Sequence, residues 1–234
     1  MMNEGDGTPV GTNRLQPMPV IEFLEDLYAA TGEKKYREAA DRAFRWVEKG
    51  PMRDWNWEGQ FEDMELAPKY DDLSKYAPIA TALYVLRRFP GDPNYLKFAR
   101  EAVRFAEDQF VCWERPEHNG FGIRSLTDSP VNEQHHYATW ICPAVLEQYY
   151  YYVPVDASAA TMIQAYLAIH AAEGNPLDMA KARTLGEALC RMQKDDGFIP
   201  TLWFGSYPTN GDRGWLNCLA ADAAALDALS TANP

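Results

Sequence analysis

The residues most suited to chemistry gather in three segments, and the densest of these covers residues 54–63, with the sequence DWNWEGQFED. The flat rings of Trp55 and Trp57 suit the apolar face of a pyranose ring, and the amide of Gln60 suits its hydroxyls. Glycosidic cleavage needs two carboxyl groups, one protonated and one ionised. The candidates for these catalytic roles are Glu58, Glu62 and Asp63. A solvated acidic loop that the tryptophans anchor to the fold is the alternative.

The second segment contains Trp113, Arg124 and the run His135, His136 and Tyr137. Histidine and tyrosine are common proton-transfer groups, so these three residues are catalytic candidates for a β-elimination. Arg124 would neutralise the carboxylate of an acidic sugar, and Trp113 would contact its ring. Surface exposure is the alternative for each residue taken singly. We predict no metal site, because adjacent histidines tend to point apart and no His-x-x-x-His pattern occurs.

The third segment begins with DDGFIPTLW at residues 195–203. Asp196 is its catalytic candidate, and Trp203, Arg213 and Trp215 are candidates for substrate contact. An Asp-Gly pair is also a common turn, so a purely structural role for Asp196 stays open. Upstream, Asp156 is predicted mainly as a helix N-cap, with a place at the mouth of a cleft as the alternative.

Helical periodicity dominates the chain that must position these segments. Apolar residues at spacings of three and four predict helices over residues 18–31, 34–48, 73–89, 94–111, 157–173, 177–193 and 214–230. Tight turns join the first six helices in pairs, which predicts three antiparallel hairpins and half of a fourth. The region from His136 to Val153 is ambiguous between strand and helix. Residues 144–150 would continue a helix, and we predict a short helix that ends near Tyr152. Asp156 or Ser158 would then cap the next helix.

Composition excludes several classes of protein. The 234 residues include 34 acidic and 22 basic side chains, for a formal net charge of -12, which argues against nucleic acid as a partner. No stretch reaches the ~20 apolar residues that span a bilayer, so no membrane partner is expected. The four cysteines are solitary in the sequence, and no nucleotide-binding glycine motif occurs, so no cofactor is predicted. The N-terminus has no visible signal peptide.

The hairpin rhythm, the phrase YAATGEKKY at residues 28–36 and the tryptophans between hairpins together resemble the six-hairpin, or (α/α) toroid, carbohydrate-active proteins. That family includes glycoside hydrolases and polysaccharide lyases. The resemblance implies an all-α fold: a small or partial (α/α) toroid of about three and a half hairpins in one domain over residues 17–234, after a flexible segment 1–16. It also implies that Asp196 and its neighbours line a cleft, and it allows a periplasmic or secreted location for a soluble chain.

These observations predict a carbohydrate-active protein that cleaves a glycosidic bond in an oligo- or polysaccharide. Hydrolysis would use two of the candidate carboxylates, and elimination would use His135, His136 or Tyr137 together with Arg124 or Arg213; the sequence leaves both open. A non-catalytic glycan-binding or structural part of a larger toroid is the alternative function. The incomplete hairpin count also makes a homo-oligomer an expectation.

Overall fold

The structure of the chain is a computed structural model, and it describes residues 17–55, 57, 75–114, 142–147, 153–201, 203 and 214–232. Helices contain 76% of the described residues, so the chain is mostly helical as the periodicity predicts. It divides into two compact units, unit 1 over Met1–Ala102 and unit 2 over Val103–Pro234. The segment 1–16 lies outside the described residues, and the single domain over residues 17–234 stays a prediction.

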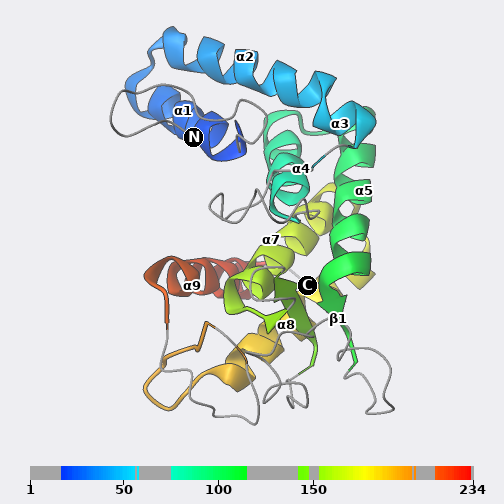
Figure 1. The fold of residues 1–234 in the computed structure, drawn as a ribbon, viewed down its shortest axis with the longest axis vertical. Helices are drawn as coiled ribbons and strands as arrows, with labels where there is room; N and C mark the ends of the chain where they lie inside the picture. The colour runs from blue at the N-terminus through cyan, green and yellow to red at the C-terminus, as the bar shows by residue number, and fades with distance from the viewer. Residues whose placement is uncertain are drawn as a thin grey trace, which may run out of the picture. The chain divides into compact units, whose positions relative to one another are not determined.

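Unit 1 is built from helices that begin and end within three residues of their predicted positions (Figure 1). They are α1 (Pro17–Thr31), α2 (Lys34–Lys49), α4 (Tyr76–Arg88) and the first part of α5 (Pro93–Phe110), with the single turn α3 (Pro51–Asp54) after α2. The α1–α2 turn contains Gly32 at a φ of 71°, a left-handed conformation that favours glycine. Helix α1 packs against both α2 and α4. The predicted first hairpin is therefore confirmed.

Aromatic side chains form much of the core of unit 1. The ring of Phe44 on α2 lies 4.9 Å from that of Tyr84 on α4 and 5.8 Å from that of Phe89, measured between ring centroids. Phe89 stacks on Tyr95 at 4.6 Å, across the turn that joins α4 to α5. Rings at these separations attract each other beyond the burial of their surface. Part of the aromatic content of the chain therefore serves packing.

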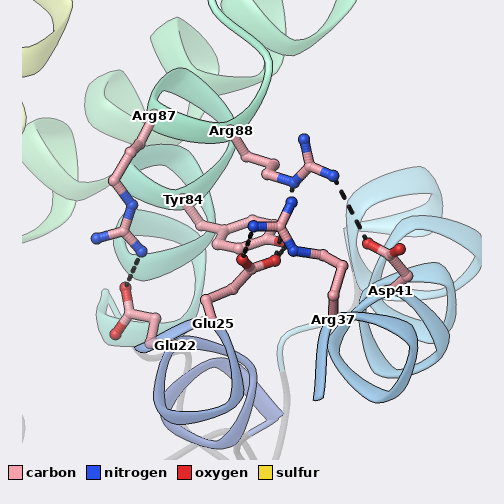
Figure 2. Close-up of polar contacts among 7 residues, drawn as sticks. All are labelled: Glu22, Glu25, Arg37, Asp41, Tyr84, Arg87 and Arg88. Atoms are coloured by element: carbon pink, nitrogen blue, oxygen red, sulfur yellow. Dashed lines mark hydrogen bonds and ion pairs between the residues drawn. The ribbon is translucent and has the colours of Figure 1, made fainter. Parts of the chain in front are cut away.

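A polar cluster connects α1, α2 and α4 (Figure 2). Arg37 Nη2 lies 2.7 Å from Glu25 Oε2, and Arg88 Nε lies 3.8 Å from Glu25 Oε1. The hydroxyl of Tyr84 donates a hydrogen bond of 3.3 Å to Glu25 Oε1. Burial, and then the negative charge of Glu25, raises the pKa of Tyr84 to about 12, so this hydroxyl keeps its proton. Glu25 is thus held by two cations and a donor from the neighbouring helices.

Unit 2 contains a small antiparallel sheet that follows directly on α5. Its strands, in the spatial order β1-β2-β3, are β1 (Val111–Cys112), β2 (Ala144–Glu147) and β3 (Val153–Pro154). Cys112 lies opposite Ala144, and Leu146 lies opposite Pro154. The prediction of a short helix from Ala144 is therefore wrong over residues 144–147. Every residue of β2 is buried, and pairing on both sides outweighs the helical tendency of this short apolar run.

Three long helices follow the sheet in unit 2 (Figure 1). They are α7 (Asp156–Glu173), α8 (Pro176–Met192) and α9 (Leu216–Thr231). Helix α7 packs against α8, α9 and β2. A Cβ atom at Gly186 would lie 2.4 Å from Leu229 Cδ2, so this glycine allows α8 to approach α9 closely. None of the helices in the described ranges is long and apolar enough to cross a membrane.

Candidate functional site

The structure describes six of the side chains that the sequence analysis singled out for catalysis or substrate contact. These six are Trp55, Trp57, Trp113, Asp196, Trp203 and Trp215. The others lie outside the described residues, and their roles stay predictions. They are Glu58, Gln60, Glu62, Asp63, Arg124, His135, His136, Tyr137 and Arg213.

Trp55 and Trp57 follow α3 and pack against α5 within unit 1. Their ring centroids lie 5.9 Å apart in an edge-to-face arrangement, and the Trp55 ring lies 5.7 Å from that of Phe98. Trp57 is buried, whereas Trp55 is partly exposed and has a positive φ of 59°. The ring of Trp57 therefore packs in the core, and its contact with a sugar stays a prediction.

In unit 2, the edge of the Trp113 ring is hydrogen-bonded to one member of an ion pair. Its Nε1 donates a hydrogen bond of 3.2 Å to Glu107 Oε1. The ammonium of Lys181 on α8 lies 2.6 and 2.7 Å from the two carboxylate oxygens of Glu107. The same ammonium lies 5.8 Å from the centroid of the Trp113 ring. The orientation of the ring is fixed from within the fold, and one of its faces meets a cation.

Asp196 is exposed in the turn that follows α8. Its Oδ1 accepts a hydrogen bond of 3.0 Å from the backbone N–H of Phe198, and Gly197 between them has a φ of 88°. This arrangement is an Asx turn, in which the carboxylate replaces a backbone acceptor. The observed contact of Asp196 is therefore structural, and its catalytic role stays a prediction.

The most unusual group of side chains in the described part of unit 2 is a pair of buried carboxyls, Asp156 and Asp222. Asp156 begins α7 and Asp222 lies in α9, and the exposed fractions of the two residues are 0% and 1%. Asp156 Oδ2 and both carboxyl oxygens of Asp222 make no well-formed hydrogen bond within the described residues. Buried polar groups are nearly always hydrogen-bonded, so this pair is exceptional.

Backbone hydrogen bonds assemble this pair and the loop beside it. The N–H of Asp156 donates to the carbonyl of Thr201 at 3.1 Å, and the N–H of Trp203 donates to the carbonyl of Pro154 at 3.1 Å. The hydroxyl Oγ1 of Thr201 accepts from the N–H of Trp215 at 3.0 Å. Thr201 therefore connects the start of α7 to the residue that precedes α9. These bonds place Trp203 and Trp215, two of the predicted substrate contacts, near Asp156 at the start of α7.

The two tryptophans in this place differ in exposure. The ring of Trp203 is buried, and its Nε1 donates a hydrogen bond of 3.0 Å to the carbonyl of Pro200. Trp215 is 41% exposed, an uncommon exposure for so large an apolar side chain. Of the two rings, that of Trp215 is the more exposed, and substrate contact by either residue stays a prediction.

Burial raises the pKa of both carboxyls. Burial and then the neighbouring Asp156 raise the pKa of Asp222 to about 8, whereas burial raises that of Asp156 to about 6. Asp156 shifts less because its Oδ1 accepts a hydrogen bond of 2.6 Å from the N–H of Ala157, and because Thr201 and Cys218 favour its ionised form. Two carboxyls in contact cannot both ionise cheaply, so the pair shares one proton near neutral pH. Because Asp156 accepts the hydrogen bond from Ala157, its ionised form is favoured, and we assign the shared proton to Asp222.

The predicted N-cap of α7 requires a correction. Val155 occupies the N-cap position and makes no side-chain capping bond, and Asp156 is the first helical residue. Ser158 lies inside the helix, where its hydroxyl donates to Glu147 Oε2 on β2 at 3.1 Å. The position of Asp156 still places its negative charge at the positive end of the helix dipole.

Sequence reasoning missed Asp222 entirely. The residue lies in an alanine-rich helix, where Cys218, Asp222 and Ala225 recur at the spacing of one buried face. A carboxylate at a periodic core position is the signal that could have identified it. A pair of carboxyls is too small a ligand set for a structural metal, and the described ranges contain no cluster of three or more potential ligands.

Comparison with known proteins leaves the resemblance to the toroid family as a prediction. No family model matches the chain, and no curated protein or solved structure has significant similarity to it.

Proposed function

We propose that this chain is a carbohydrate-active protein with (α/α) toroid-like architecture, and that it cleaves glycosidic bonds by hydrolysis. The observation that carries the proposal is the buried pair Asp156 and Asp222, which keeps one proton near neutral pH. Hydrolysis of a glycoside requires a carboxylic acid that stays protonated at the working pH and gives its proton to the leaving oxygen. Asp222 takes this role, and Asp156 is the ionised partner that keeps the proton in place.

The exposed ring of Trp215 supports the choice of a sugar as substrate. Its backbone N–H is bound by Thr201, whose side chain also interacts with the Asp156 carboxyl. A flat apolar ring beside carboxyl groups matches the two kinds of surface that a pyranose presents. Thr201 thus connects the aromatic platform to Asp156, the ionised partner of the acid.

The Asp156–Asp222 pair supplies only the acid, which is one of the two carboxyl groups that glycosidic hydrolysis requires. The two carboxyls of a glycosidase stand about 5 to 9.5 Å apart, which leaves room for the sugar carbon and, in inverting enzymes, for water. Side chains that share a proton are closer than this, so the nucleophile or base comes from elsewhere in the chain. β-Elimination rests on His135, His136, Tyr137, Arg124 and Arg213, which lie outside the described residues.

A second candidate function is glycan binding without cleavage. It is favoured by the exposures of 0% and 1% at the two carboxyls, which leave little of either group open to a substrate. In that case Trp215 would hold the sugar, and the pair would only shape the loop.

The test is an activity screen against neutral and uronate-containing oligosaccharides, followed by the variant Asp222→Asn on any substrate that is cleaved. Asn keeps the volume of the side chain but cannot deliver the proton, so kcat should fall by about 100-fold or more. Asp227→Asn is the matched control, because Asp227 is an exposed acid on the same helix. It should retain activity within about twofold.

The outcomes separate the two candidate functions. Release of reducing ends that Asp222→Asn abolishes supports hydrolysis, whereas an unsaturated product with its ultraviolet absorbance indicates elimination. A thermal shift with saccharide but without product supports glycan binding. The carbohydrate proposal would be overturned if no saccharide were cleaved and none produced a thermal shift.

A further inference from the structure

Two of the four cysteines meet at the small sheet of unit 2. Cys112 ends β1 and lies opposite Ala144 of β2, and Cys142 precedes Ala144 by two residues. This register places Cys142 within two residues of the strand position that faces Cys112. The pairing therefore brings together two cysteines that stand thirty positions apart in the sequence.

The environment of the two thiols agrees with this proximity. Both residues are partly buried, and both are thiols in the structure. Burial, and then the charge of Cys142, raises the pKa of Cys112 to about 11, so the two sulfur groups interact electrostatically. Arg191 on α8 donates a hydrogen bond of 2.8 Å from Nη2 to the carbonyl of Cys142. This bond fixes the backbone of Cys142 beside the sheet.

We propose that Cys112 and Cys142 form a redox-active dithiol, which a low-molecular-weight disulfide such as oxidised glutathione converts into an intramolecular disulfide. The thiolate of Cys142 attacks one sulfur of the oxidant, forms a mixed disulfide and releases the first glutathione thiolate. The sulfur of Cys112 then displaces the second glutathione and forms the protein disulfide. Two protein thiols are oxidised, one glutathione disulfide is reduced, and the two protons go to the released thiolates.

The disulfide requires the Cα atoms of the two cysteines to stand about 4.4–6.8 Å apart. The end of β1 can adjust to this distance, because β1 contributes only two residues to the sheet. The bond would covalently join the two ends of residues 113–141 and so stabilise unit 2 by restricting the unfolded chain. The proposed disulfide does not depend on the proposed function of the chain.

The remaining cysteines provide the contrast. Cys190 is exposed on α8, and Cys218 is buried on α9, so both lie in helices outside the sheet. Cys190 neighbours Arg191 in sequence, which makes a Cys142–Cys190 bond the competing product.

The experiment equilibrates the full chain in glutathione buffers of increasing oxidised fraction, counts free thiols and maps disulfides by mass spectrometry under non-reducing conditions. The wild type should lose two of its four thiols together and yield the linked peptides of Cys112 and Cys142. Its thermal midpoint should rise by about 5–10 °C on oxidation. Cys112→Ser and Cys142→Ser should each remove the disulfide and the thermal shift, whereas Cys190→Ser should preserve both.

Three results would overturn the proposal, and all can be read on the wild-type chain. They are retention of four thiols across the whole range of buffers, glutathione adducts on both cysteines without a bond between them, and a mapped bond from Cys142 to Cys190.

Discussion

In unit 1 the carboxylate of Glu25 lies between the guanidinium groups of Arg37 and Arg88, whereas in unit 2 the carboxyl of Asp222 lies against that of Asp156. Both environments remove a carboxyl from most of its water, since the Glu25 side chain is 11% exposed and Asp222 is 1% exposed. In the first, opposite charges and a tyrosine hydroxyl replace the lost hydration. In the second, the neighbouring ionisable group is another carboxyl.

The Glu25 cluster stabilises the folded state, whereas the Asp156–Asp222 pair destabilises it. The Glu25 cluster offsets the desolvation of its carboxylate with ion pairs, and it connects three helices. The Asp pair is compensated by hydrogen bonds to Asp156 rather than by ion pairs, and two carboxyls in contact are tolerated only with a shared proton. Strongly perturbed carboxyls that a fold retains at a cost in stability are candidates for function, and this contrast is why we place the site in unit 2.

The largest effect should come from Glu25→Gln. The substitution keeps the shape but removes the charge, so Arg37 and Arg88 lose their partly buried counterion. We expect the free energy of unfolding of unit 1 to fall by about 2–3 kcal/mol. Urea unfolding measures this loss of stability. Hydrogen exchange shows whether the loss is located in α1, α2 and α4.

Glu101→Gln is the matched control, because Glu101 pairs with Lys97 at 3.9 Å on the exposed surface of α5. Its effect should stay below about 0.5 kcal/mol. If the two variants lose the same amount, the Glu25 cluster is an ordinary surface network and the contrast with the Asp pair fails.

An intermediate effect of opposite sign should come from Asp222→Asn. The folded-state pKa of Asp222 lies above its unfolded value, so the folded state binds the extra proton. The stability that this proton provides is complete below about pH 4 and is lost as the pH rises through about 8. Asn removes this dependence, so at pH 8 the variant should be more stable than the wild type. We expect a gain of about 1–2 kcal/mol, less than the pKa shift alone implies, because an amide reproduces only part of the hydrogen bonding of a protonated carboxyl.

Unfolding of unit 2 measured from pH 4 to pH 9 tests this expectation, with Asp227→Asn as the control that retains the wild-type slope. A wild-type stability that rises steadily with pH over this range would mean that the pair carries no raised pKa.

The smallest effect should come from Thr201→Val, which preserves shape but removes the hydroxyl that accepts from the N–H of Trp215. We expect a loss of about 1 kcal/mol in unit 2, because one buried donor loses its partner. The pKa of Asp156 should also rise, since Thr201 favours its ionised form. Thr184→Val, at an exposed position on α8 where the hydroxyl bonds only to the carbonyl of Ala180, is the control. Equal losses in the two variants would show that Thr201 does not link the site.

The helices could be predicted closely from the sequence, because their signals are local. Apolar residues repeat every three or four positions, and glycines in the left-handed conformation mark the turns at Gly32, Gly91 and Gly174. The strand β2 could not be predicted, because residues 144–147 have no clear period and become a strand only by pairing with β1 and β3.

The candidate site was harder to predict than the helices. Its loop tryptophans were recognised by type, but whether a ring is buried like Trp203 or exposed like Trp215 depends on the atoms packed around it. Asp156 was assigned mainly to a cap, and Asp222 was overlooked among alanines. Its significance comes from a neighbour 66 positions earlier in the chain.

The sequence by itself determined where the long helices of this protein begin and end, to within about three residues, and the aromatic and acidic character of the segments between them. These properties depend on residues within a few positions of one another. Only the tertiary structure decided which carboxyls meet a cation and which meet each other, and which cysteines become neighbours. Those outcomes depend on charge compensation and burial, and both are properties of side chains that distant parts of the chain bring into contact.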